Sequence, residues 1–216
     1  MEVNCDFARE HGYLFVPQCV DAALAWRLRK QVLEICAERG WMPPGFRGFG
    51  YEGSEFLELQ GQVAALPEFS EMRSSPGIAQ VLAQLIGPDF IAHQGDVCRV
   101  FFPDAPSYAT RAHQDQFFLR RPEEIWSVWI PLGDCPPEMG PLCVWPGSCS
   151  LGLLPHEGES GCERAAKEAG ATWESFDFAC GDALFVNKLT VHRALPNVSR
   201  ETRVSVDFRY AQNRHK

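Results

Sequence analysis

Apolar residues recur at helical intervals near the beginning of the chain. The run between residues 24 and 35 repeats every three or four positions, which gathers its apolar side chains on one face of a helix. Asp21 is a residue type that caps helix amino termini, and Gly40 is typical of a helix end. The pattern therefore predicts a helix from Asp21 to about Arg39. Its apolar face consists of Leu24, Leu28, Val32 and Ile35.

A second helix is predicted between Ser75 and Gly87. Pro76 suits the first position of a helix, and Val81, Leu82 and Leu85 supply a buried face. The segment 40–75 between the two helices is rich in Gly, Pro and aromatic residues. We expect it to form an irregular covering segment.

From Ile91 onward the pattern changes to short β-type runs separated by Pro and Gly. The last run alternates apolar and polar residues from 204 to 209, which is typical of a strand with one face in a core. Several short strands at near-regular spacing indicate a barrel or a sandwich. A short helix is expected in the polar excursion 157–172. The predicted strands are 97–102, 125–132, 142–145, 183–186 and 204–210.

Composition narrows the possible classes of protein. The chain has 216 residues, 45% of them hydrophobic, which is enough to bury one sizeable core. Its net charge of −8 opposes phosphate backbones and anionic surfaces, so we expect no nucleic acid and no membrane as partners. Nine cysteines without a C-x-x-C pair favour reduced thiols. These features predict a soluble cytoplasmic protein.

Three residues that lie far apart carry the expected chemistry. His113 and Asp115 follow a predicted strand and are separated by one residue, so in extended backbone they project to the same side. His192 lies beyond another predicted strand and offers a third ligand. Two imidazoles and one carboxylate on one face of an octahedral ion leave adjacent positions open, as in non-haem Fe(II) oxygenases. An open face lets O2 and a chelating cosubstrate reach the metal.

Arg203 strengthens this interpretation because it follows His192 by eleven positions and begins the alternating strand. A guanidinium grips a carboxylate in two hydrogen bonds, and a nearby hydroxyl adds a third. Ser205 lies on the same face of the strand as Arg203, and Thr110 precedes the H-x-D motif closely enough to offer a second hydroxyl. We expect these groups to hold the far carboxylate of 2-oxoglutarate.

The order and spacing of six motifs resemble the phytanoyl-CoA dioxygenase family. An opening of similar sequence, FAREHGYLFVP at 7–17, precedes them. The motifs are HQDQFF at 113–118, WSVWIPL at 126–132, GPLCVWPGS at 140–148, GDALF at 181–185, HRALPNVS at 192–199 and RVSVDFRY at 203–210.

This resemblance implies a mainly β fold with flanking helices, namely a double-stranded β-helix of the jelly-roll or cupin type. It implies one domain, in which residues 1–90 form a helical and covering segment and residues 91–212 form the jelly-roll core. The reaction that it implies uses Fe(II), 2-oxoglutarate and O2 to hydroxylate a C–H bond of a small-molecule substrate, with release of succinate and CO2.

The same resemblance implies roles for particular residues. Fe(II) is bound by His113, Asp115 and His192, and 2-oxoglutarate is held by Arg203. Trp129 and Gln114 match positions that often border the cosubstrate.

Other residues are candidates for contact with the substrate. Gln94 and Arg99, on the strand before His113, suit a polar or anionic group. The aromatic residues Phe117 and Phe118 are candidates for the pocket wall, as are Trp126 and Phe208. His93 and His156 are expected to make ordinary polar contacts, and Asn197 to order a turn.

Two features separate the chain from the family's pattern. Cys149 stands where many members have a histidine after Pro-Gly-Ser, and no long basic segment is present to hold the phosphates of coenzyme A. A CoA thioester is therefore a poor candidate substrate. The identity of the substrate, the choice between hydroxylation, desaturation and ring closure, and the oligomeric state stay open.

Two other functions are compatible with the same ligand set. One is a redox-neutral cupin-fold metalloenzyme, which would show no dependence on 2-oxoglutarate. The other is a non-catalytic cupin-like module that binds a ligand without turnover.

Overall fold

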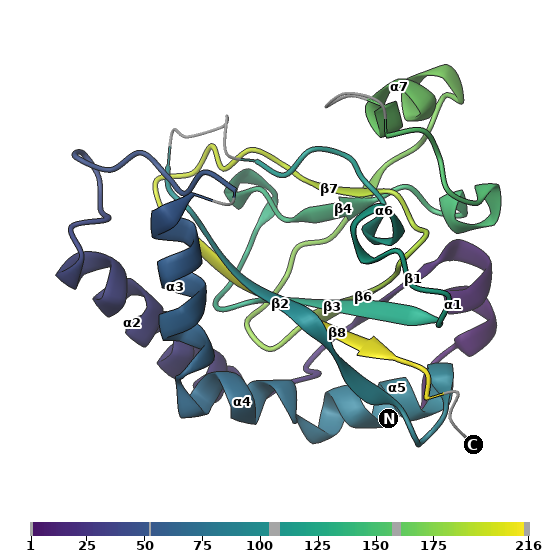
Figure 1. Ribbon diagram of the computed structural model, residues 1–216, viewed down its shortest axis with the longest axis horizontal. Coiled ribbons are helices and arrows are strands. Elements are labelled where there is room, and N and C mark those ends of the chain that lie inside the picture. Colours follow the sequence, from purple (N-terminus) through teal and green to yellow (C-terminus); the bar gives the residue numbers. More distant parts are fainter. Residues whose placement is uncertain (1, 52, 104–108, 157–160, 214–216) are drawn as a thin grey trace.

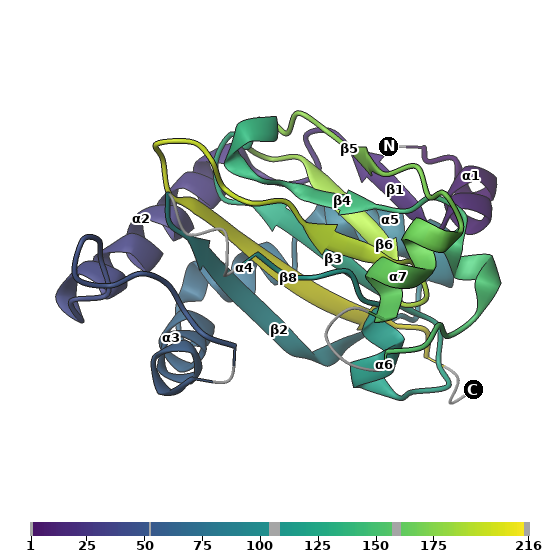
Figure 2. The ribbon, with the colours of Figure 1, turned by 90° about the horizontal axis from the view of Figure 1, so that it is seen from above.

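Two antiparallel sheets form the centre of the molecule, and helices cover the outer face of the larger one (Figures 1 and 2). The computed structural model describes residues 2–51, 53–103, 109–156 and 161–213. The larger sheet has the spatial order β1-β6-β3-β8-β2 and the smaller one the order β5-β4-β7. The strands are β1 (Tyr13–Val16), β2 (Ile91–Phe101), β3 (Ile125–Pro131), β4 (Leu142–Val144), β5 (Glu174–Ser175), β6 (Ala183–Asn187), β7 (His192–Ala194) and β8 (Arg203–Ala211).

Helices α2, α4 and α5 lie along the outer face of the larger sheet, and α6 and α7 lie near the smaller one (Figure 1). The predicted cap of α2 is present, because the Asp21 carboxylate accepts a hydrogen bond from the Ala23 N–H at 2.8 Å. The α-helices are α1 (Cys5–His11), α2 (Ala22–Glu38), α3 (Ser54–Ala64), α4 (Pro67–Arg73), α5 (Pro76–Ile86), α6 (Asp115–Leu119) and α7 (Gly161–Glu168), and the 3-10 helices are η2 (Pro137–Met139) and η3 (Ser148–Leu151).

The prediction of an irregular segment at 40–75 is wrong for its second half, which forms α3 and α4. Phe56, Leu59 and Val63 recur at helical spacing and are buried, and Pro67 occupies the first turn of α4. The many Gly, Pro and aromatic residues before them conceal this short periodicity. Of the polar excursion 157–172, residues 157–160 lie outside the described part, and α7 accounts for much of the rest.

The main core lies between the helices and the larger sheet. Leu28 and Val32 of α2 pack there with Val206 and Phe208 of β8. The predicted alternation of β8 is confirmed, because Val204, Val206 and Phe208 face this core while Arg203 and Asp207 line a cavity on the other side. β8 therefore presents one face to the main core and the other to the cavity.

The described residues contain no helix that is both long and apolar enough to cross a membrane. The nine cysteines are free thiols. β1 lies in the amino-terminal part of the chain and pairs with β6 of the larger sheet. The division into residues 1–90 and 91–212 stays a prediction.

Candidate metal and cosubstrate site

Two histidines that are far apart in sequence are direct backbone partners. The His113 N–H donates to the His192 carbonyl at 3.0 Å, and the His192 N–H donates to the His113 carbonyl at 3.0 Å. This isolated antiparallel bridge joins the segment before α6 to β7 of the smaller sheet. Their ring centroids lie 4.3 Å apart. The two imidazoles are therefore fixed side by side by the main chain.

Asp115 completes a cluster of possible metal ligands. Gln114 has extended backbone, so His113 and Asp115 project to the same side as predicted, and α6 begins at Asp115. One Asp115 carboxylate oxygen, Oδ1, lies 3.6 Å from His113 Nε2 and 3.9 Å from His192 Nε2. One donor atom from each of the three residues falls within 4.8 Å of the others. Two imidazole nitrogens and a carboxylate oxygen form a donor set that suits Fe(II).

Hydrogen bonds at the other ring nitrogens orient both imidazoles. His113 Nδ1 lies 2.8 Å from the Arg111 carbonyl, and His192 Nδ1 lies 3.0 Å from the Thr190 carbonyl. These contacts place the Nδ1 proton toward the main chain and leave the Nε2 lone pair for a metal. Burial and the neighbouring His113 lower the pKa of His192 to about 4, so its imidazole is neutral at pH 7.

Arg209 is a residue that the sequence interpretation missed. It lies on the same face of β8 as Arg203, and its Nη2 is 3.4 Å from Asp115 Oδ1. Ser127 on β3 donates its hydroxyl to the other carboxylate oxygen of Asp115. Burial alone would raise the pKa of the Asp115 carboxyl, but Arg209 and the two imidazoles hold it well below its usual value. Asp115 is therefore ionised and held in one orientation.

Arg203 lies at the inner end of the same site. It is 1% exposed, and its guanidinium carbon lies 4.0 Å from the ring centroid of Phe101 and 5.8 Å from that of Trp129. One amino group, Nη1, donates to the Gly140 carbonyl. Nε and Nη2 have no partner among the described residues, and neither has the buried Ser205 hydroxyl. Buried donors of this kind are costly unless a ligand satisfies them, so the Arg203 guanidinium, which lines a cavity, fits the carboxylate of 2-oxoglutarate.

A cavity of about 20 Å³ connects the metal ligands to Arg203. Thr110 and Trp129, both predicted to border the cosubstrate, line it. Ser205 is fully buried beside this region but is not among the residues that line the cavity. The lining residues are Arg99, Thr110, His113, Asp115, Trp129, Leu142, His192, Ala194, Arg203, Asp207 and Arg209.

Gly140 allows the close approach that gives Arg203 its carbonyl partner. Its φ is +75°, and a Cβ there would lie 2.3 Å from the Leu195 carbonyl oxygen. We expect Gly140→Ala to lose more stability than Gly40→Ala, whose φ is +71° but whose added Cβ would meet no atom within 4 Å. Gly40→Ala carries only left-handed strain of about 1–2 kcal/mol, and Gly140→Ala adds overpacking of about 1–3 kcal/mol. Urea unfolding of both variants checks this, and equal losses would contradict it.

Gln114 lies elsewhere than its predicted place beside the cosubstrate. The side chain is fully buried and lines neither of the two cavities that contain site residues. Its amide nitrogen donates to the carbonyls of Gly152 at 2.8 Å and Leu189 at 2.6 Å, and its oxygen accepts from the Leu154 N–H at 2.8 Å. Gln114 lies away from the cosubstrate because, in extended backbone, the alternation that points His113 and Asp115 toward the site turns the residue between them to the opposite side. Gln114 instead ties the H-x-D motif to the loop before His192.

We expect Gln114→Leu, a change of similar size, to weaken both the fold and metal binding. It removes the side-chain partner of three part-buried backbone groups, with a loss of stability of about 1–3 kcal/mol. Mutation of a residue that orients metal ligands without binding the metal itself typically changes metal affinity by about 10- to 100-fold. Urea unfolding and anaerobic Fe(II) titration measure the two effects. Gln80→Leu, on the exposed face of α5, is the control and should change neither; Fe(II) affinity unchanged in Gln114→Leu would contradict the assigned role.

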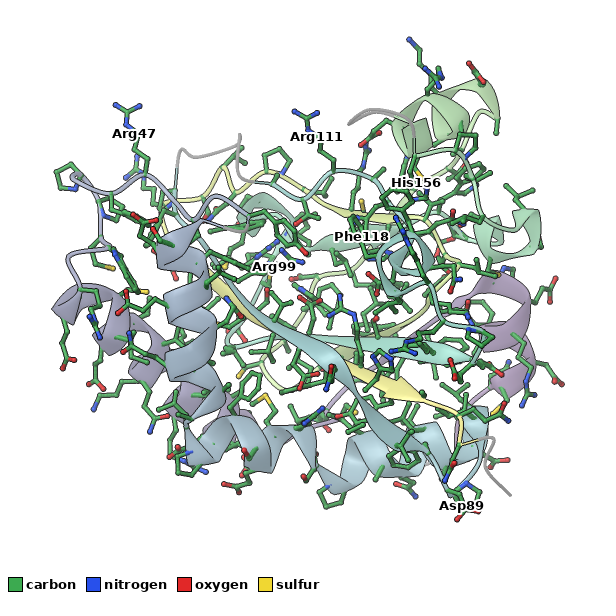
Figure 3. The ribbon with its side chains drawn as sticks, in the orientation of Figure 1. Arg47, Asp89, Arg99, Arg111, Phe118 and His156 are labelled. Carbon is green, nitrogen blue, oxygen red and sulfur yellow. The ribbon has the colours of Figure 1, made fainter. Side chains whose placement is uncertain are left out.

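A second, larger cavity of about 670 Å³ opens beyond the metal ligands. Phe117, Phe118 and Arg99, which are candidates for contact with the substrate, line this cavity, and so does His156. Their contact with a substrate stays a prediction. Figure 3 labels Arg99, Phe118 and His156, which come from β2, α6 and the segment before α7, and Phe118 among them is exposed.

Three residues expected at the substrate pocket lie elsewhere. Gln94 is exposed on β2, next to the irregular register between His93 and Val97. Trp126 and Phe208 belong to the main core, because the faces of β3 and β8 that carry them point toward the helices. None of the three lines either cavity.

The remaining residues singled out from the sequence have structural contacts. The Asn197 amide donates to the carbonyls of Phe101 and Glu201, which orders its turn as expected. His93 Nδ1 contacts the Gln94 carbonyl at 2.7 Å. The Cys149 thiol packs against the end of α1 beside Gly12 and lines neither cavity.

Similarity to known proteins agrees with this geometry. Residues 8–205 match the family profile described as phytanoyl-CoA dioxygenase (PhyH). The chain belongs to the phytanoyl-CoA dioxygenase family. It is a 2-oxoglutarate-dependent non-haem iron oxygenase, and the residues described above fit both iron and the cosubstrate. Among the functions considered from the sequence, membership of this family favours the oxygenase over the redox-neutral enzyme and the binding module.

A curated relative of this PhyH-family oxygenase is the 1-deoxypentalenic acid 11-beta-hydroxylase of Streptomyces arenae. It is 24% identical over 226 residues, which cover 94% of this chain and 78% of the relative. Two solved structures share the fold, each with a TM-score of 0.74 at 20% identity over 96% of this chain. One is the epimerase SnoN in complex with Fe3+, alpha ketoglutarate and nogalamycin RO, of which 82% is covered. The other is the alpha ketoglutarate dependent carbocyclase SnoK from nogalamycin biosynthesis, of which 83% is covered. The predicted double-stranded β-helix is thereby confirmed.

Proposed function

We propose that this oxygenase hydroxylates a C–H bond of a small, largely apolar organic molecule, with Fe(II) on His113, Asp115 and His192 and 2-oxoglutarate on Arg203. The observation that carries the proposal is the buried Arg203 guanidinium, which has unpaired donors and lines the same cavity as the three metal ligands. A buried cation with unpaired donors is costly, and an anionic ligand bound beside the metal would satisfy both its charge and its donors.

The chain's own part in the reaction is to hold and orient. Ser127 and Arg209 fix the Asp115 carboxylate, and main-chain carbonyls fix both imidazoles, so the ligands need not reorganise when a metal binds. When bound, iron and 2-oxoglutarate supply the oxidising chemistry. Thr110 and Trp129 then border the cosubstrate, and the larger cavity keeps the reacting C–H bond near the metal and away from bulk water.

Hydroxylation is favoured by two curated relatives, 24% and 25% identical to this chain, both of which are named 1-deoxypentalenic acid 11-beta-hydroxylase. The names of SnoN and SnoK describe an epimerase and a carbocyclase on the same fold. These proteins act on small-molecule natural products, which supports a small molecule as the substrate here. The acidic net charge and the free thiols support a cytoplasmic location with neither nucleic acid nor membrane as a partner.

The test compares matched histidine variants under anaerobic conditions. Wild type should bind Fe(II) and then 2-oxoglutarate, and after admission of O2 it should form succinate and CO2 slowly even without a primary substrate. His113→Ala should lose Fe(II) binding and succinate formation, whereas His93→Ala, outside both cavities, should retain them. With a hydroxylated substrate in hand, ¹⁸O from ¹⁸O2 should appear in the new alcohol. Succinate formation by His113→Ala at the wild-type rate would overturn the proposal.

A further inference from the structure

The larger cavity combines aromatic walls with a deeply placed cation. Its apolar lining includes Phe49, Tyr51, Phe56, Phe101 and Phe117, contributed by the covering segment, β2 and α6. Such a surface suits the rings or chain of an apolar molecule. Arg99 lines this cavity and also the inner cavity that holds the metal ligands. It therefore lies where the two cavities meet.

Arg99 is held in place by one partner and retains donors for another. Its Nε lies 3.1 Å from Asp207 Oδ2 across the β2–β8 pair, and its side chain is 16% exposed. The two terminal amino groups, Nη1 and Nη2, have no hydrogen-bond partner among the described residues. A guanidinium fixed at Nε presents its other N–H groups as a planar fork, the geometry that grips a carboxylate.

The charged side chains that line the inner cavity have a net positive charge. Of the described side chains that line it, Arg99, Arg203 and Arg209 are cationic and Asp115 and Asp207 are anionic, a surplus of one positive charge. The larger cavity adds the cation Arg111, but this side chain is exposed, so water weakens its interaction with a bound ligand. Fe(II) and doubly charged 2-oxoglutarate cancel one another, so the loaded site keeps this surplus. An enclosed site with one extra positive charge favours a ligand with one negative charge.

The other two arginines are already engaged. Arg209 contacts Asp115 through Nη2 and donates to the Gly95 carbonyl through Nη1, and its one donor without a partner among the described residues is Nε, a single N–H that cannot grip a carboxylate in two bonds. Arg203 donates to the Gly140 carbonyl, and its free donors belong to the proposed cosubstrate pocket. Arg99 is therefore the guanidinium available to the primary substrate.

We propose that the primary substrate is an apolar monocarboxylic acid whose carboxylate binds the Nη1 and Nη2 groups of Arg99 while its hydrocarbon body packs against the aromatic walls. This inference rests on the proposed function and adds the substrate class. A phosphate monoester fits less well, because it carries about −1.5 to −2 charges at pH 7 and exceeds the surplus of one.

The experiment uses two probes that differ in charge and little in shape, 2-naphthoic acid and 2-naphthamide. Each is titrated into the protein loaded anaerobically with Fe(II) and 2-oxoglutarate, and binding is followed by calorimetry. Wild type should bind the acid at least about 10-fold more tightly than the amide, the usual size of a charge-assisted hydrogen bond. 2-Naphthyl phosphate should bind no more tightly than the acid.

Matched variants assign this preference to Arg99. Arg99→Gln should bind acid and amide equally, and Arg99→Lys should keep part of the preference because the charge remains while the fork is lost. Arg111→Gln makes the same change of charge at an exposed side chain that points outward in Figure 3. Arg111 also lines the larger cavity, and this variant should keep the preference. The double variant Arg99→Gln/Asp207→Asn removes the unpaired carboxylate and should behave like Arg99→Gln if the single variant is too unstable to purify.

Several results would overturn the inference. They are equal binding of acid and amide by wild type, no measurable binding of the acid, tighter binding of 2-naphthyl phosphate than of the acid, or an equal loss of preference in Arg99→Gln and Arg111→Gln. A further contradicting result is an Arg99→Gln variant that no longer binds 2-oxoglutarate, since Arg99 would then serve the cosubstrate. Failure of wild type to bind Fe(II) or 2-oxoglutarate would instead count against the proposed function, which keeps the two failures distinguishable.

Discussion

Arg203→Gln should weaken 2-oxoglutarate binding by about 100-fold or more while leaving Fe(II) binding intact. Loss of one partner from a buried, charge-assisted pair typically costs about 2–5 kcal/mol, and the aromatic rings of Phe101 and Trp129 leave little room for water to replace it. Calorimetric titration of 2-oxoglutarate into the Fe(II)-loaded variant measures the effect. The 2-oxoglutarate affinity of Arg203→Lys should lie between those of wild type and Arg203→Gln, because an ammonium keeps the charge but lacks the planar arrangement of N–H donors.

The control for this prediction is Arg27→Gln on the exposed side of α2, which makes the same change of charge far from the cavity. Its 2-oxoglutarate affinity should equal that of wild type. If Arg203→Gln also binds the cosubstrate normally, the far carboxylate is held elsewhere and the assigned pocket is incorrect.

Asp115→Asn should reduce Fe(II) affinity by more than about 100-fold, because residues behind a ligand already change metal affinity by about 10- to 100-fold. The amide keeps the size of the side chain and an acceptor for the Ser127 hydroxyl, but it removes the anionic ligand. Anaerobic titration with Fe(II), read by calorimetry, measures the loss. Unfolding in urea should show some destabilisation as well, since Arg209 loses the carboxylate that balances its buried charge.

Asp134→Asn is the matched control, since Asp134 is exposed and accepts a hydrogen bond from the Cys180 N–H that an asparagine oxygen also accepts. This variant should bind Fe(II) as wild type does. An Asp115→Asn protein with undiminished Fe(II) affinity would rule out the carboxylate as a ligand.

The sequence predicted the elements in which local chemistry and tertiary packing agree. The helix after Asp21 has both a capping carboxylate and an apolar face, and the strand 203–211 has an alternating pattern that separates core residues from site residues. Helices α3 and α4 were missed because Gly, Pro and aromatic residues in 40–53 suggested loop structure for the whole segment. The spacing of Phe56, Leu59 and Val63 was the signal that would have revealed α3.

The site contacts that the sequence did not predict join residues that lie far apart in the chain. Arg209 meets Asp115 across 94 positions of sequence, and only the pairing of β8 with β2 and β3 brings them together. The alternation of β8 already placed Arg209 on the face of Arg203, so this residue was within reach of sequence reasoning. The contacts of Gln114 with two separate loops were not, because no local pattern encodes which carbonyls will surround a buried amide.

The reciprocal backbone hydrogen bonds between His113 and His192 have a practical consequence. Since the main chain holds these ligands at their spacing, the cation contributes little to keeping them together, and a chelator should strip it without unfolding the domain. The emptied scaffold can then be recharged with Co(II) or Ni(II), ions that occupy such donor sets without driving the oxidation. Enzyme prepared in this way would hold 2-oxoglutarate and a candidate acid together in air, long enough for crystals or slow spectroscopic titrations.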